Sequence, residues 1–92
     1  MPSRIGLALV AGKAKLGTEF AIEAIRNKSA KLVFLANDAA DNTKKKVRDK
    51  AKFYGVEVLE IFDTATLSKA VGKSNIKALA ITDQGFSNMF KK

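Results

Sequence analysis

The chain has 92 residues, 47% of them hydrophobic and 28% charged, which fits one folded domain and leaves no length for a second. Its 17 lysines and arginines against nine aspartates and glutamates give a formal charge of +8, which favours polyanionic partners such as RNA, DNA or an anionic membrane. The absence of cysteine and histidine excludes disulfides and argues against zinc and redox sites. We expect no cofactor and no bound metal.

The apolar runs are all much shorter than the roughly 20 residues of a membrane-spanning helix. The amino terminus also lacks the layout of a signal peptide. The sequence therefore predicts a cytoplasmic protein that has no membrane partner.

The first part of the chain predicts two helices and a strand. Residues 2–12 have the apolar spacing of a helix, and residues 13–17 read as a short basic connection. Thr18 is expected to cap a second helix that ends near Asn27. The continuous apolar run within residues 30–36 predicts a central strand that is covered on both faces.

The second part predicts further helices alternating with strands. Thr43 is expected to cap a third helix that ends at Gly55. Residues 56–61 predict a strand, and a fourth helix is expected from Thr64 or Thr66 to Gly72. A buried strand at 78–82 and a short helix capped by Asp83 complete the chain, which we interpret as a single α/β domain spanning residues 1–92.

The sequence carries no pattern of a catalytic site. Its paired carboxylates, such as Glu19 with Glu23, have spacings that are common on exposed helix faces. There is no histidine, nucleophile elbow or glycine-rich nucleotide fingerprint. We therefore expect a protein that is not an enzyme and has no catalytic residues.

Three segments, KLGT at 15–18, KLVFLAND at 31–38 and LSKAVG at 67–72, carry a resemblance to a known family. In order and spacing they resemble the kink-turn RNA-binding ribosomal proteins of archaeal and eukaryotic large subunits. Residues 38–47 and the segment TDQGF at 82–86 look most like the bacterial YlxQ-like branch. The resemblance implies a three-layer α/β/α sandwich with a small mixed four-stranded sheet. It also implies a non-catalytic, monomeric protein that recognises a bent or kinked RNA helix and is linked to the ribosome or to translation.

The resemblance places the RNA site at the start of the second helix and in two neighbouring loops. Gly17 matches a glycine whose backbone approaches RNA, and Ile76 matches an apolar residue that packs on an extruded nucleotide. The remaining residues implied as RNA contacts on or near this site are Lys13, Lys15, Thr18, Asn37, Asp38, Lys73, Asn75 and Lys77.

The second helix departs from the family pattern at three further site positions. Archaeal members usually have Asn, Glu and Lys where this chain has Glu19, Phe20 and Glu23. Carboxylates repel phosphate unless they accept protons from base amino groups, so the favoured RNA differs and the sequence leaves open whether a true kink-turn is bound. Phe20 is interpreted as a core or partly buried residue that packs inward with Ala24, with base stacking by an exposed ring as the alternative. The alternative function is a ribosome- or translation-associated protein adaptor with weak, non-specific RNA binding.

Overall fold

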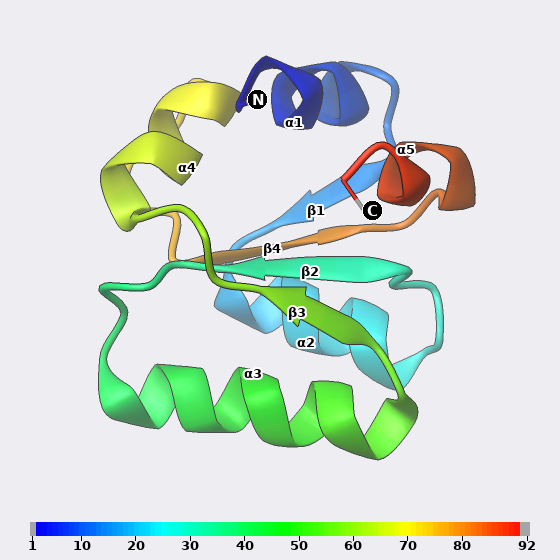
Figure 1. Cartoon of the computed structure of the whole chain (residues 1–92), viewed down its shortest axis with the longest axis vertical. Coiled ribbons are helices and arrows are strands. Elements are labelled where there is room, and N and C mark those ends of the chain that lie inside the picture. Colours follow the sequence, from blue (N-terminus) through cyan, green and yellow to red (C-terminus); the bar gives the residue numbers. More distant parts are fainter. Residues whose placement is uncertain (1, 91–92) are drawn as a thin grey trace.

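The computed structural model describes residues 2–90, and side chains from residue 5 to residue 90. A four-stranded sheet lies between two layers of helices (Figure 1). The strands are β1 (Ala14–Leu16), β2 (Leu32–Leu35), β3 (Glu57–Leu59) and β4 (Ala78–Ile81). One layer holds α1 (Pro2–Val10), α4 (Thr64–Val71) and α5 (Gln84–Asn88), and the other holds α2 (Thr18–Arg26) and α3 (Asp41–Tyr54). The expected α/β/α sandwich is confirmed.

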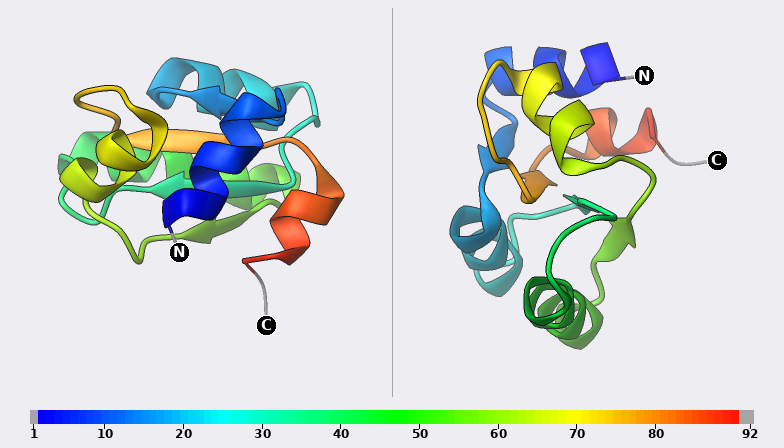
Figure 2. Two further views of the ribbon diagram at one scale, coloured as in Figure 1. Left: turned by 90° about the horizontal axis from the view of Figure 1, so that it is seen from above. Right: turned by 90° about the vertical axis from the view of Figure 1, so that its left-hand side faces the viewer.

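The sheet is mixed, in the order β1-β4-β2-β3. β4 runs antiparallel to both β1 and β2, whereas β2 and β3 are parallel. The carboxyl ends of β1, β2 and β3 therefore meet the start of β4 at one edge of the domain, called here the loop edge. α2, α3 and α4 follow these strands and begin at the loop edge, which faces the viewer on the right of Figure 2.

The two central strands form the core. Every side chain of β2 and β4 is buried, as predicted for strands that are covered on both faces. The ring of Phe34 contacts Phe62 and Phe90, with centroid distances of 5.8 and 4.9 Å. Burying a side chain of this size contributes about 1.5–3 kcal/mol, so these strands supply much of the fold's stability.

β1 was not expected, because residues 13–17 read as a connection. Its three residues mix alanine, lysine and leucine and show no strand pattern of their own. They are extended because Ala14 pairs with Ile81 and Leu16 pairs with Leu79, which lie more than 60 positions further along the chain. The sequence signal for this strand therefore lies in β4.

Two predicted helix caps were wrong. Gly17, and not Thr18, is the residue before α2, and it forms no side-chain cap. α3 begins after Ala40, because Lys44 N–H already donates to the Ala40 carbonyl at 3.0 Å, so Thr43 lies inside the helix. The expected start of α4 at Thr64 is confirmed, with the carboxylate of the preceding Asp63 as its cap.

Other predicted helix ends are confirmed. Gly55 and Gly72 end α3 and α4 in the left-handed conformation, with φ of 71° and 68°. The Asp83 carboxylate accepts a hydrogen bond from Phe86 N–H at 3.1 Å and caps α5.

Candidate nucleic-acid interface

Backbone hydrogen bonds join the segments of the loop edge into one surface. Gly17 N–H donates to the Ala78 carbonyl at 2.8 Å, and Ala36 N–H donates to the Lys77 carbonyl at 2.7 Å. Asn37 N–H donates to the carbonyl of Phe62 at 3.0 Å. The start of α2 and the loops 36–40, 60–63 and 72–77 therefore hold fixed positions relative to one another.

Gly17 lies where β1 turns into α2. Its φ of 97° and ψ of 153° belong to a region that is essentially restricted to glycine. A Cβ atom built there would have only the Phe20 ring nearby, at 4.0 Å, so space is not what requires glycine. The open backbone allows a ligand to approach the start of α2 closely.

The loop after β2 is tied to the start of α4 through Asp38. Its Oδ1 accepts hydrogen bonds from Thr64 N–H at 2.9 Å and from the Thr64 hydroxyl at 2.7 Å. These bonds, with a smaller contribution from the positive charge of Lys77, lower the pKa of Asp38. Asp38 therefore stays ionised, and its Oδ1 is already engaged within the protein. The side chain of the neighbouring Asn37 is exposed at the same edge.

The loop 72–77 has a defined shape that exposes Lys73 and engages Lys77 within the protein. Asn75 adopts a positive φ of 58°, and Ile76 N–H donates to the Ser68 hydroxyl oxygen at 2.8 Å. Ile76 is half-buried against the core, whereas Lys73 is exposed. The Lys77 ammonium donates to the Thr64 hydroxyl oxygen at 3.2 Å.

The structure separates the two lysines of the β1 segment. Lys13 lies at the opposite end of β1 from Gly17, where its carbonyl accepts a hydrogen bond from Thr82 N–H at 2.8 Å. Lys15 lies in the middle of this edge strand, and its side chain is exposed beside α2. The loop edge therefore brings together the predicted site residues in the first turn of α2 and in the loops, but not Lys13. Lys15 and Glu23 lie beside this edge, in β1 and in the second turn of α2.

The prediction that Phe20 packs inward was wrong, because its side chain is 66% exposed. α2 buries the face formed by Ala21, Ile22, Ala24 and Ile25, and Phe20 lies outside that face. The carboxylate of Glu19, one position earlier, lies 3.8 Å from the ammonium of Lys46 on α3. This exposed pair offsets part of the negative charge near Gly17.

A hollow of about 200 Å³ lies between β1 and α2, beside Phe20. We call it the α2 hollow; it is lined by Lys15, Phe20, Glu23, Ala24, Asn27 and Ser29. Asn27 and Ser29 were not among the predicted site residues. The helical spacing of 20, 23, 24 and 27, which places these positions on one face of α2, was the signal that could have found Asn27.

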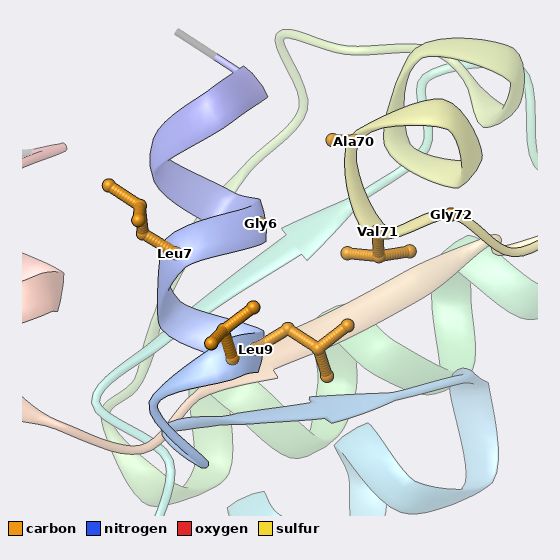
Figure 3. Close-up of a pocket in the computed structure, with 7 residues that line it drawn as sticks. Gly6, Leu7, Leu9, Ala70, Val71 and Gly72 are labelled. Carbon is orange, nitrogen blue, oxygen red and sulfur yellow. The ribbon is translucent and has the colours of Figure 1, made fainter.

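A second depression, between α1 and α4, differs in chemistry from the loop edge (Figure 3). It has a volume of about 540 Å³ and is lined by Gly6, Leu7, Leu9, Val10, Ala70, Val71 and Gly72. This lining has no polar side chain, so the depression offers no group that recognises phosphate or a base edge.

Within residues 2–90, no group of three or more acidic side chains is arranged to hold a metal ion. The same part of the chain has no helix that is long and apolar enough to cross a membrane.

The layered fold and its mixed sheet define a small α/β/α sandwich domain. Residues 1–91 match the ribosomal protein L7Ae/L30e/S12e/Gadd45 family, and the chain belongs to that family. The family resemblance seen in the sequence is thereby confirmed.

Several relatives are similar over most of the chain. The RNA-binding protein YlxQ of Enterococcus faecium is 48% identical over 88 residues, which are 96% of this chain and 84% of that protein. YlxQ of Bacillus subtilis is 44% identical over 84 residues, covering 91% and 84% of the two chains. Large ribosomal subunit protein eL30 of Tetrahymena thermophila is 33% identical over 97% of this chain and 88% of its own. These are names of non-enzymatic proteins, in agreement with the expectation that the chain is not an enzyme.

Solved structures have the same fold. A Bacillus halodurans protein of unknown function superposes with a TM-score of 0.90 at 34% identity, covering 96% of this chain and 89% of its own. The Giardia lamblia 15.5kD RNA binding protein superposes with a TM-score of 0.78 at 20% identity, covering 95% and 75%. The latter identity is too low to support more than a shared fold.

Proposed function

We propose that this protein binds RNA at the loop edge, recognises a bent or kinked helix there, and acts in the cytoplasm in connection with the ribosome or translation. The observation that carries the proposal is the junction of the Gly17 backbone with the loops 36–40 and 72–77 on one surface. The names of the YlxQ relatives, which describe RNA-binding proteins, support RNA as the ligand.

The chemistry of the loop edge suits the sugar-phosphate backbone. The first backbone N–H groups of α2 and α3 lie at this edge without a side-chain cap, and such groups together with the helix dipole favour an anionic ligand. At the start of α4, Thr64 and Thr66 N–H already donate to the carboxylates of Asp38 and Asp63. Residues 2–18 and 64–82 contain no aspartate or glutamate, and they contribute Lys15, Lys73 and Lys77. Lysines of this kind supply affinity by releasing counterions from phosphate.

The arrangement of the surface favours a bent RNA over a straight one. Its contact groups come from a helix start and from separate loops, and hydrogen bonds fix their relative positions. A bend brings phosphates of two helical segments toward one such surface, whereas a straight duplex presents them along one line. Shape therefore selects the RNA, and base contacts add to this selection.

The test is a titration of the protein with a kink-turn RNA and with a straight duplex of equal length, at two salt concentrations. We expect tighter binding to the kink-turn RNA, with an affinity that falls steeply as salt rises. Lys73→Glu should weaken binding by about tenfold and decrease the salt slope by about one. Lys50→Glu, a change of the same charge at an exposed position on α3, is the matched control and should have a much smaller effect.

A different result would contradict the proposed function. Weak binding that is equal for the two RNAs, with the same response to Lys73→Glu and Lys50→Glu, would indicate attraction by net charge alone. The protein-adaptor function would then be the better account.

A further inference from the structure

We propose that the α2 hollow binds one unpaired nucleobase, which stacks on the ring of Phe20. This inference rests on the proposed function, because the base belongs to the RNA that docks at the loop edge. It specifies one of the base contacts that add to the recognition of backbone and shape.

The position of Phe20 places its ring next to the docked RNA. Phe20 lies in the first turn of α2, and its Cδ2 atom is 4.0 Å from the position that a Cβ atom on Gly17 would take. An RNA backbone close to Gly17 therefore passes beside this ring. With 66% of its surface exposed, the ring has a face available for stacking.

The lining of the hollow has the chemistry of a nucleotide site. Phe20 and the buried Ala24 supply apolar surface, and the exposed side chains of Lys15, Glu23 and Asn27 surround it. A base has flat apolar faces and a polar edge, and it is linked to a phosphate. Phe20 and Ala24 match the faces, the side chains of Glu23 and Asn27 match the edge, and Lys15 matches the phosphate. The depression between α1 and α4 lacks such polar groups, which distinguishes the two surfaces.

The polar side chains of the hollow are available for an RNA ligand. Among the residues that the structure describes, neither Lys15 nor Glu23 is within ion-pair distance of an opposite charge. The Oδ1 atom of Asn27 accepts a hydrogen bond from Ser29 N–H at 3.0 Å, which orients the amide. Its NH₂ group is then the part that can donate to a base edge.

Glu23 indicates which bases the hollow accepts. An ionised carboxylate only accepts hydrogen bonds, so it favours a base that carries an exocyclic amino group. Adenine, guanine and cytosine have this group, and uracil does not. We therefore expect uracil to bind least well in the hollow, with Lys15 contacting the attached phosphate.

The experiment measures affinity for the kink-turn RNA while each of its unpaired nucleotides is replaced in turn by an abasic one. At one position this replacement should weaken binding by about tenfold, within the range that one base–aromatic stack supplies. Phe20→Ala should weaken binding to the intact RNA by the same factor and add no further loss on that abasic RNA. Phe20→Trp, which keeps an aromatic ring, should bind the intact RNA about as tightly as the unchanged protein does.

A matched control uses the other strongly exposed phenylalanine. Phe53 on α3 is 80% exposed and lies on an element outside the hollow, so Phe53→Ala should leave the affinity unchanged.

The preference of the hollow among bases is tested by placing uracil at the RNA position where the abasic replacement weakens binding. Glu23→Gln should reduce the discrimination against uracil, because the amide can also donate.

The outcomes separate the inference from the function on which it rests. If Phe20→Ala binds as the unchanged protein does, or if its loss simply adds to the abasic loss, no base stacks on Phe20. A retained preference for kink-turn RNA over duplex would still support RNA recognition at the loop edge. If the unchanged protein does not distinguish these two RNAs, the proposed function fails and the base site fails with it.

Discussion

Asp38 and Thr64 are joined by two hydrogen bonds across a separation of 26 positions in the chain. One carboxylate oxygen of Asp38 accepts from both the backbone N–H and the hydroxyl of Thr64, at 2.9 and 2.7 Å. The Lys77 ammonium donates to the same hydroxyl oxygen at 3.2 Å. These contacts connect the loop after β2, the start of α4 and the loop before β4, so Asp38 organises the loop edge.

Replacing Asp38 by alanine should loosen the loop edge. We expect a lower urea midpoint, faster amide hydrogen exchange at Thr64, and weaker RNA binding. Asp38→Asn keeps an oxygen that accepts from Thr64 and should lie between the two proteins. An alanine variant with unchanged hydrogen exchange at Thr64 would show that the contact does not hold the loops together.

The stability of the protein should decrease in acid. Hydrogen bonds from Thr64, Arg48 and Thr66 lower the pKa values of Asp38, Glu60 and Asp63, respectively. A carboxyl group with a lowered folded-state pKa stabilises the fold above its unfolded-state pKa of about 4, and this stabilisation is lost as the pH falls through the folded-state pKa.

We therefore expect the free energy of unfolding to change little above about pH 5, where these groups are ionised in both states, and to fall below about pH 4. Urea titrations from pH 7 to pH 2 measure this dependence. The double variant Asp38→Asn and Asp63→Asn should show a shallower fall than the unchanged protein. Equal slopes for the two proteins would exclude these carboxylates as the source.

The parts of the fold that follow from local sequence were predictable. β2 and β4 are apolar throughout, and Gly55 and Gly72 end their helices because a left-handed residue is needed there. β1 was not predictable in this way, because its extended form depends on pairing with β4. A three-residue strand that is held extended by a distant partner shows no strand pattern in its own sequence.

The site was predictable to a similar extent. The family resemblance pointed to Gly17 and the two loops, which the fold does bring to one edge. The exposure of Phe20 was missed because an aromatic residue next to an alanine-rich helix face suggests core packing. Only the actual rotation of α2 over the sheet shows that Ala21, Ile22, Ala24 and Ile25 fill the buried face. The bonds of Asp38 to Thr64 were also missed, since they link separate loops.

Gly17 should tolerate substitution less well than Gly55. Gly17 has φ 97° and ψ 153°, where a residue with a side chain is strained by about 1–3 kcal/mol. Gly55 has φ 71° and ψ 33°, a left-handed conformation that asparagine adopts readily. Gly17→Asn should therefore lower the free energy of unfolding by more than Gly55→Asn does, as measured by urea denaturation. Equal losses would mean that the backbone at Gly17 relaxes to an ordinary conformation.

Replacing Gly6 by alanine should lower the stability of the protein, although alanine normally stabilises the interior of a helix by about 0.5–1 kcal/mol relative to glycine. A Cβ atom on Gly6 would lie 2.8 Å from the backbone carbonyl oxygen of Ala70, so α1 and α4 would have to move apart. Overpacking of this kind costs about 1–3 kcal/mol, which exceeds the gain in helix propensity.

Thermal and urea unfolding of Gly6→Ala should therefore show a loss of stability. Val10→Ala is the control in the same helix, because Val10 is 86% exposed and an exposed substitution usually changes stability by less than about 0.5 kcal/mol. A stabilised Gly6→Ala protein would show that α1 shifts over α4 without cost. The contact between these helices would then not depend on the absence of a side chain at position 6.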